Sequence, residues 1–336
     1  MTEWSCFKVV RISFVIVFAL VLLGGPLGRG VEAQGKGPGR APLSKIRISI
    51  PAPSLSYLPI YVALQKGFFA RRGFEIEFIQ MMPAMSASAL LNQAIDYTTV
   101  PSSVATAGAR GAPLKTICFT SVKLQHFLVS RPEIKLVSDL AGKRIGASGF
   151  GNLPSYEIQV LIDKYRLGSN TAIVAVRSSP ERLIAMQRGA IDAGIIGPPL
   201  DLKGEEMGLK RLLHMGTILQ IPQAGLATTD EMLRKRRGEV IEVLKATIEG
   251  LDYTWNQREG VIDIIARWIS LNPSQAGKAY DSVQDTFSKD GIPSEEQAKA
   301  YISMLTATAG LGEISPAAIF DFSLAAEAAK ETAANR

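Results

Sequence analysis

Short blocks of apolar residues, separated by polar or glycine- and proline-rich stretches, run through the first two thirds of the chain. Blocks with the length and composition of β-strands cover residues 46–50, 74–79, 97–100, 114–119, 144–147, 173–176 and 193–196. Helical spacing appears between them, at residues 59–67, 87–94, 101–110, 155–165 and 179–188. Strands that alternate with helices predict an α/β fold whose sheets are largely parallel and covered on both faces.

The pattern occurs twice, about one hundred residues apart. Arg47 and Ile48 return as Arg144 and Ile145, Leu58 and Pro59 as Leu153 and Pro154, Tyr61 as Tyr156, and the tripeptide at 94–96 as that at 190–192. Two similar α/β units in one chain predict two lobes that face each other across a cleft. Such an architecture favours the capture of a small molecule.

The last third of the chain has a different pattern. Helical spacing dominates there, at residues 240–255, 261–271, 274–287, 294–310 and 316–334. The chain has just crossed back towards the first unit, so we assign this helical tail to lobe one. The predicted boundaries are 44–122 with 226–336 for lobe one and 123–225 for lobe two.

The first 33 residues have the features of a secretory signal peptide. Lys8 and Arg11 precede an apolar run over residues 12–23, and small residues at Val31 and Ala33 fit a cleavage site after Ala33. The alternative is a membrane anchor, but twelve residues are too few for a hydrocarbon layer of about 30 Å. Residues 34–43 are rich in Gly, Pro and Lys and predict a flexible leader. We therefore expect an exported, soluble, periplasmic protein.

The composition of the chain limits the classes of function that it can have. The 336 residues are 47% hydrophobic and 20% charged, as in a globular protein with room for two domains. The net charge of +6 is spread along the chain without a basic, aromatic-rich stripe, so no nucleic-acid partner is expected. Cys118 is the one thiol outside the predicted signal peptide, and its apolar surroundings predict a core residue.

Candidate chemistry lies in loops that follow predicted strands, at residues 53–57, 101–103, 148–155 and 197–199. Open parallel sheets bind ligands outside the carboxyl ends of their strands, and helix N-termini there stabilise anions by about 0.3–1 kcal/mol. The loops carry hydroxyl, amide and tyrosine side chains and no charge, which suits reversible binding of a small polar ligand. The candidate ligand-binding residues are Ser54, Tyr57, Pro101, Ser102, Ser103, Gly149, Asn152, Ser155 and Pro198.

Each candidate also has a structural interpretation. The serines serve as helix caps in many proteins, Tyr57 can pack on the following helix, and Pro198 can end a strand. Residues 149–152 lack the spacing of a nucleotide-binding loop. His126 and His214 lack metal-ligand spacing, and no catalytic triad or nucleophile elbow is evident. We expect no catalytic residue, metal or cofactor.

Four segments, taken in their order, resemble a known family. They are YLPIYVALQKGFFARRGFEIEFI, LLNQAIDYTTVPSSVATAGARGAPLKTI, DLAGKRIGASGFGNLPSYEIQVLI and RLIAMQRGAIDAGIIGPPL. The family is that of the periplasmic solute-binding proteins of ABC importers, in the nitrate/sulfonate/taurine and thiamine-pyrimidine-precursor group. The resemblance implies the type II, two-lobed periplasmic-binding-protein fold, with crossovers at 121–127 and 220–227 that place Gln125 and Gln223 at the hinge.

The resemblance implies a receptor that captures a small polar or anionic organic solute, such as a sulfonate, nitrate, taurine or a pyrimidine, and delivers it to an inner-membrane permease. We expect a monomer and not an enzyme. Two alternatives stay open: an enzyme on the same scaffold that acts on a small anionic or heteroaromatic metabolite, and a sensory ligand-binding module. The cysteine-rich iron motif of the fungal pyrimidine synthases, which share the fold, has no counterpart here.

Overall fold

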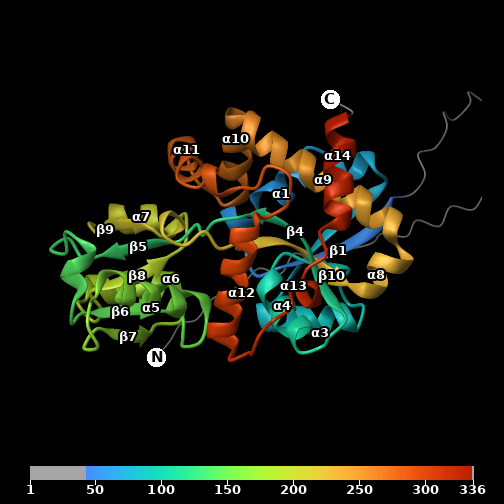
Figure 1. Ribbon diagram of the computed structural model, residues 1–336. Helices are drawn as coiled ribbons and strands as arrows, with labels where there is room; N and C mark the ends of the chain where they lie inside the picture. The colour runs from blue at the N-terminus through green and yellow to red at the C-terminus, as the bar shows by residue number, and fades with distance from the viewer. Residues whose placement is uncertain (1–42, 335–336) are drawn as a thin grey trace, which may run out of the picture. The chain divides into compact units, whose positions relative to one another are not determined.

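Two five-stranded mixed sheets, each flanked by helices, make up the computed structural model, which describes residues 43–334 (Figure 1). The predicted signal peptide and nearly all of the predicted leader lie outside the described residues. The α/β prediction is confirmed. The helices and strands follow in chain order, and each sheet is built almost entirely from its own stretch of sequence.

The first sheet has the strand order β2-β1-β3-β10-β4. Its strands are β1 (Ser44–Ile50), β2 (Phe74–Gln80), β3 (Tyr97–Thr98), β4 (Leu114–Ser121) and β10 (Ala224–Thr229). The helices of this unit are α1 (Leu58–Gln65), α2 (Phe68–Arg71), α3 (Ser86–Leu91) and α4 (Pro101–Ala109), with the 3₁₀ turns η1 (Leu55–Tyr57) and η2 (Pro83–Met85). Only β10 runs against its neighbours, because it returns from the other sheet.

The second sheet repeats this plan with the order β7-β6-β8-β5-β9. Its strands are β5 (Phe127–Ser130), β6 (Arg144–Ala147), β7 (Ala172–Ala175), β8 (Ala193–Ile196) and β9 (Lys210–His214). The helices are α5 (Leu153–Tyr165), α6 (Ser179–Gln187) and α7 (Leu200–Glu206), with η3 (Val137–Leu140) and η4 (Met215–Thr217). The antiparallel strand is β5, which enters from the first sheet and occupies the position that β10 has there.

An arginine–aspartate staple explains the sequence repeat. In the first unit, Asp96 Oδ2 accepts from the backbone N–H of Arg47 at 2.8 Å and from its Nε at 3.3 Å, and Arg47 Nη2 reaches the Gln93 carbonyl. Arg144, Asp192 and the Gly189 carbonyl make the same contacts in the second unit, at 2.9, 3.2 and 2.8 Å. The repeated residues therefore tie β1 to the turn before β3 in the first unit, and β6 to the turn before β8 in the second.

The helical tail comprises α8 (Asp230–Lys235), α9 (Arg237–Asn256), α10 (Arg258–Trp268), α11 (Pro273–Asp281), η5 (Gln284–Thr286), α12 (Glu295–Ala309), α13 (Pro316–Ile319) and α14 (Ser323–Ala334). The single helix predicted over residues 316–334 is wrong. The chain breaks between α13 and α14 because Phe320 forms a β-bridge with Thr116 and the amide of Asp321 donates to the Thr116 carbonyl. The Asp321 carboxylate then accepts from the amide of Ser323 at 3.0 Å.

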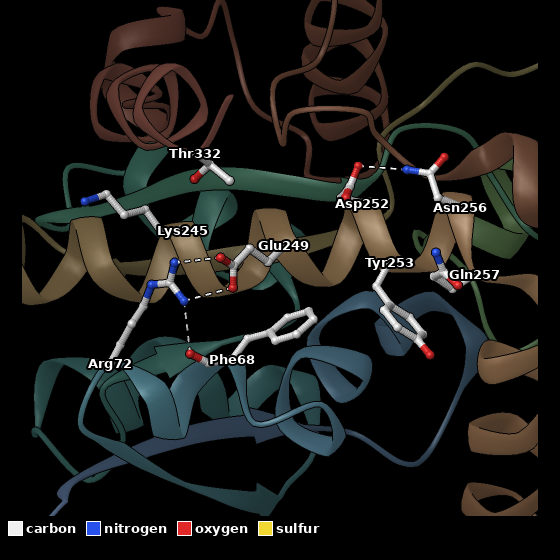
Figure 2. Close-up of a pocket in the computed structure, with 9 residues that line it drawn as sticks. All are labelled: Phe68, Arg72, Lys245, Glu249, Asp252, Tyr253, Asn256, Gln257 and Thr332. Atoms are coloured by element: carbon white, nitrogen blue, oxygen red, sulfur yellow. Dashed lines mark hydrogen bonds and ion pairs between the residues drawn. The ribbon is translucent and has the colours of Figure 1, made fainter. Parts of the chain in front are cut away.

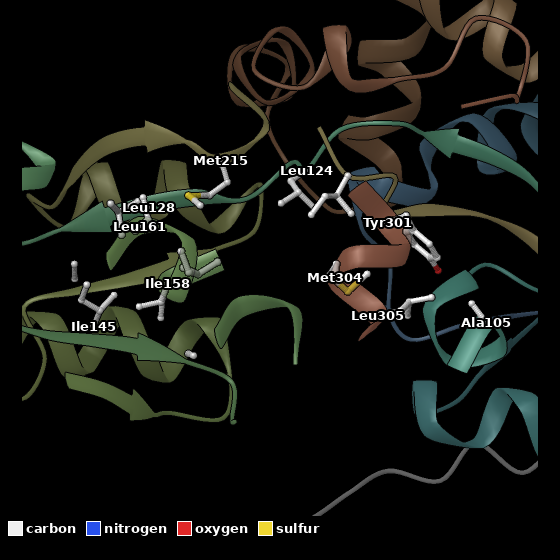
Figure 3. Close-up of a cluster of buried hydrophobic side chains, with 14 of the residues drawn as sticks. Ala105, Leu124, Leu128, Ile145, Ile158, Leu161, Met215, Tyr301, Met304 and Leu305 are labelled. Atoms are coloured by element: carbon white, nitrogen blue, oxygen red, sulfur yellow. The ribbon is translucent and has the colours of Figure 1, made fainter. Parts of the chain in front are cut away.

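Most of the tail packs beside the first sheet, where α9 contacts α1 and α14 (Figure 1). Helix α12 also contacts α5, which belongs to the second sheet. Tyr301, Met304 and Leu305 of α12 join one buried cluster with Ile158 and Leu161 of α5 (Figure 3). One helix of the tail therefore touches both halves of the described chain.

Cys118 lies in the core between the first sheet and its helices, with 1% of its surface exposed. Burial raises the pKa of this thiol to about 12, so it stays protonated at neutral pH. The prediction of a core cysteine is confirmed. Among the described helices, none is both long and apolar enough to span a membrane.

The staple generates a stability prediction. Burial opposes ionisation of Asp192, but the backbone and side-chain N–H groups of Arg144 outweigh it, so the pKa of this carboxyl is lowered. Asp192→Asn should lower the free energy of unfolding by about 1–3 kcal/mol at pH 7, because the hydrogen bonds lose their charged acceptor. The measurement is urea denaturation of both proteins at a series of pH values.

A lowered folded-state pKa stabilises the fold above the ordinary aspartate pKa, and this stabilisation fades as the pH falls through the lowered value. The difference between Asp192→Asn and the parent should therefore shrink as the pH falls through the lowered pKa of Asp192. Asp263→Asn, at an exposed position of α10, is the matched control. Equal losses in the two variants would contradict a staple at Asp192.

Candidate functional site

The two segments that join the sheets meet at Gln125, which is fully buried. Its Oε1 accepts from the Ser56 hydroxyl at 3.1 Å, and its Nε2 donates to the Thr286 hydroxyl at 2.9 Å. Its backbone N–H donates to Gln223 Oε1 at 2.9 Å. The two glutamines expected at the hinge therefore contact each other, and they connect the turn after β1, both crossovers and η5.

Ser54 and Tyr57 lie in the turn after β1, which also contains Ser56, a partner of Gln125. Ser54 is the N-cap of η1, and its hydroxyl accepts from the Ser56 amide at 3.4 Å. The Tyr57 side chain is half-buried, and burial raises its pKa to about 12 against the opposing effect of a hydrogen bond with Thr99. The Thr99 hydroxyl itself donates to the Ser49 carbonyl at 3.0 Å. The Tyr57 phenol interacts with Thr99, and a phenol oxygen can both donate to and accept from a ligand.

Pro101, Ser102 and Ser103 form the first turn of α4, directly after Thr99 and Val100. The Ser103 hydroxyl donates to the Val100 carbonyl at 3.0 Å, which is a structural role. The Ser102 side chain is half-buried. The backbone carbonyl of Ser102 accepts from the Thr106 hydroxyl. Ser102 is thus the serine of this turn whose hydroxyl the fold leaves least committed.

The loop after β6 is organised by a capping box at the start of α5. Asn152 Oδ1 accepts from the Ser155 amide at 3.2 Å, and the Ser155 hydroxyl accepts from the Asn152 amide at 3.1 Å. Asn152 Nδ2 donates to the Ser148 hydroxyl at 3.1 Å. Asn152 and Ser155 therefore hold the loop in shape. Gly149 is half-buried within it and leaves its backbone close to the Asn152 amide.

Pro198 lies in the turn after β8 and is buried, and the following residues enter α7. Gly197, next to it, faces the ring of His126: a Cβ on this glycine would lie 3.6 Å from His126 Cδ2. The loops expected to line the site thus follow β1, β3, β6 and β8, the strands that hold corresponding places in the two sheets. Within the described residues, no three His, Cys, Asp or Glu side chains are placed to hold a metal ion.

The structure also places charged residues beneath these uncharged loops, which the sequence analysis did not identify. Glu157 of α5 is fully buried, and its Oε1 lies 2.6 Å from His126 Nδ1. Arg182 of α6 is 4% exposed and donates to the carbonyls of Ile195 and Val176 and to the Ser179 hydroxyl. Burial lowers the pKa of Arg182, while the nearby Glu157 raises it.

Helical periodicity could have identified both buried charges. Glu157 precedes Leu161 by four residues, and Arg182 precedes Met186 by four, so each shares the apolar face of its helix. Glycines on the sheet supply a second signal, because a Cβ on Gly146 or Gly194 would meet the aliphatic part of Arg182 at 3.2 or 3.4 Å. These glycines provide the space in which the arginine lies against the strands.

A separate pocket of about 300 Å³ lies between α2, α9 and α14, and none of the candidate residues lines it (Figure 2). Two of its charged residues, Arg72 and Glu249, are paired with each other. Arg72 donates from Nη1 and Nη2 to the Glu249 carboxylate at 2.9 and 3.0 Å, and Nη1 also reaches the Phe68 carbonyl. The pocket is therefore a groove on the helical side of the first unit, apart from the loops described above.

Three known proteins illustrate what the chain is similar to. Riboflavin-binding protein RibY of Chloroflexus aurantiacus is 23% identical over 270 residues, which cover 77% of this chain and 73% of that protein. The periplasmic aliphatic sulphonate-binding protein SsuA of Escherichia coli shares the fold with a TM-score of 0.66 at 17% identity, over 81% of this chain and 95% of SsuA. The desulfurization enzyme DszB has a TM-score of 0.65 at 13% identity, over 85% of this chain and 99% of DszB.

The resemblance stated from the sequence motifs is confirmed. The family model described as NMT1/THI5 like matches residues 54–260, a range that includes the turn after β1, both crossovers and all of the second sheet. These structural similarities support the periplasmic-binding-protein fold that the motifs implied. The chain belongs to the NMT1/THI5-like family.

Proposed function

We propose that this chain is the solute-binding receptor of an ABC importer, exported to the periplasm, where it captures a small organic solute between its two halves. The observation that carries the proposal is the junction at Gln125 and Gln223, which joins two sheets of matching topology through neutral hydrogen bonds. The names of SsuA and RibY, both binding proteins, support it. Ligand binding would shift such a pair of units towards a closed arrangement.

The proposed binding surface consists of the loops at the carboxyl ends of β1, β3, β6 and β8. Tyr57 and Ser102 are the strongest side-chain candidates on the first sheet, because their hydroxyls retain hydrogen-bonding capacity. On the second sheet the candidates are Gly149 and the turn at Pro198, while Asn152 and Ser155 act as scaffold. This arrangement suits a polar or anionic solute bound through hydroxyls and backbone N–H groups.

An enzyme on the same scaffold is the second candidate, because DszB shares the fold and because His126 and Glu157 form a close acid–base pair. The pair is enclosed, however, with Glu157 fully buried and both nitrogens of His126 engaged by protein partners. Its geometry suits a structural link better than proton transfer to a substrate. A receptor returns its ligand chemically unchanged, whereas an enzyme converts it.

The first functional prediction concerns ligand identity. A thermal-shift screen of alkanesulfonates, taurine, nitrate, pyrimidines and riboflavin should identify a solute that stabilises the chain by about 2.7 kcal/mol at 100 times its dissociation constant. Tyr57→Phe should lower the affinity for that solute by about threefold to tenfold, because one hydroxyl contact is lost. Tyr253→Phe, in the separate pocket on α9, is the matched control. Recovery of a chemically altered solute would instead support the second candidate function, that of an enzyme.

The second functional prediction tests the hinge without touching the proposed binding loops. Thr286→Val removes the hydroxyl that accepts from Gln125 Nε2, and should cost about 1–2 kcal/mol of unfolding free energy. It should also change the affinity for the solute found in the screen, because the balance between open and closed arrangements shifts. Isothermal titration calorimetry and urea denaturation measure the two effects.

Thr247→Val is the control for this variant. Thr247 is also buried and donates to a carbonyl four residues back in α9, but it does not contact Gln125. The two variants should share the loss of a local hydrogen bond, and only Thr286→Val should alter affinity. An unchanged affinity in Thr286→Val would count against a hinge at Gln125.

A further inference from the structure

A chain of hydrogen bonds runs from the junction into the second sheet. The backbone N–H of Gln125 donates to Gln223 Oε1 at 2.9 Å. Gln223 Nε2 lies 3.3 Å from His126 Nε2, and His126 Nδ1 lies 2.6 Å from Glu157 Oε1. The chain therefore connects the first crossover, the second crossover and α5.

The hydrogen bond between the Gln125 N–H and Gln223 determines which atom donates in each of the other hydrogen bonds of this chain. A backbone N–H can only donate, so the Gln223 atom that faces Gln125 must be the carbonyl oxygen. The amide nitrogen of Gln223 then faces His126 and donates to it, which requires a lone pair on His126 Nε2. The proton of the neutral ring must accordingly reside on Nδ1, from which it is donated to the Glu157 carboxylate.

A protonated His126 cannot keep this chain intact. Its Nε2 would carry a hydrogen that faces the NH₂ group of Gln223, and two donors would oppose each other. Turning the Gln223 amide over would give His126 an acceptor, but it would place the NH₂ group against the Gln125 N–H. No orientation of the amide satisfies both neighbours when the ring is charged, so one bond between the crossovers must break.

We propose that His126 is a protonation-sensitive latch: the neutral ring ties the two crossovers together, and the charged ring releases one of their hydrogen bonds. Histidine is the side chain whose charge ordinarily changes within the physiological pH range, so pH is the variable that tests the latch. The release frees Gln223 while the Glu157 carboxylate retains the charged ring in the second sheet. The latch regulates the junction and does not depend on which solute the protein binds.

The charged groups around His126 favour a charged ring that stays with Glu157 and releases Gln223. Glu157 is fully buried and its Oε2 has no hydrogen-bond partner among the described residues, so the carboxylate can support a charged ring. Arg182 is close enough to influence Glu157 from the other helix, and Gly197 brings no charge to the ring. His214, the last residue of β9, stacks on the ring of Phe127.

His214 is the second titratable group near the latch and must be distinguished from it. Burial lowers its pKa, with Asp285 raising it and Lys123 and His126 lowering it further. Lys123 and Asp285 pair with each other at 3.0 Å on the first crossover and η5. His214 lies outside the chain of hydrogen bonds at the junction, so it serves as a control position.

Gln223→Glu tests the latch by supplying an acceptor to both neighbours. A carboxylate at this position accepts from the Gln125 N–H with one oxygen and from a charged His126 with the other. Hydrogen exchange of the Gln125 amide, corrected for the intrinsic rate, should be about threefold to tenfold faster at pH 5 than at pH 8 in the parent protein. In Gln223→Glu the Gln125 N–H keeps its acceptor in both states of the ring, so the faster exchange at pH 5 should be lost.

Two further variants complete the test. His126→Gln should abolish the pH dependence of Gln125 exchange, and His214→Gln should preserve it. Independently of any variant, ¹⁵N chemical shifts of the parent protein at pH 8 should show His126 with its proton on Nδ1. A proton on Nε2, the same direction of pH dependence in Gln223→Glu and the parent, or loss of the dependence in His214→Gln would overturn the proposal.

Discussion

The arrangement of this protein depends on one buried, uncharged side chain. Gln125 satisfies a hydroxyl in the turn after β1, a hydroxyl in η5 and, through its backbone, the amide of Gln223. A buried amide whose partners were lost would cost about 1–3 kcal/mol for each unsatisfied group. The position of the two crossovers is therefore specified by geometry, and the loops that follow β1 and β3 are set relative to the second sheet.

Much of the fold could be predicted because repeated chemistry marks repeated structure. Arg47 and Asp96 recur as Arg144 and Asp192 since β1 and the turn before β3 need the same staple as β6 and the turn before β8. Strands β5, β9 and β10 were not predicted, because they lie in or next to the connecting segments and tertiary pairing defines them. The break between α13 and α14 could not be predicted from the sequence either, because a tertiary β-bridge to Thr116 causes it.

The loops of the candidate site could be listed from the sequence because they follow predicted strands, but the roles of their side chains could not be. Gln125 and Gln223, which the family resemblance implied for the crossovers, contact each other. The sequence analysis could not separate ligand contacts from scaffold: Asn152 and Ser155 form a capping box, a role that short polar side chains share with binding. It also missed Glu157, although this residue shares the apolar face of α5 with Leu161, because a charged side chain is ordinarily assigned to the surface.

The central claim is that two rigid halves move about the Gln125 junction to enclose an unmodified solute. Double electron–electron resonance between spin labels at Ser88 of α3 and Lys164 of α5, both exposed, tests it most directly. The account predicts one narrow distance population that shifts as a whole when a stabilising solute is added, and that returns when the solute is removed unchanged. A distance that does not respond to the solute, or a broad population without it, would contradict the account.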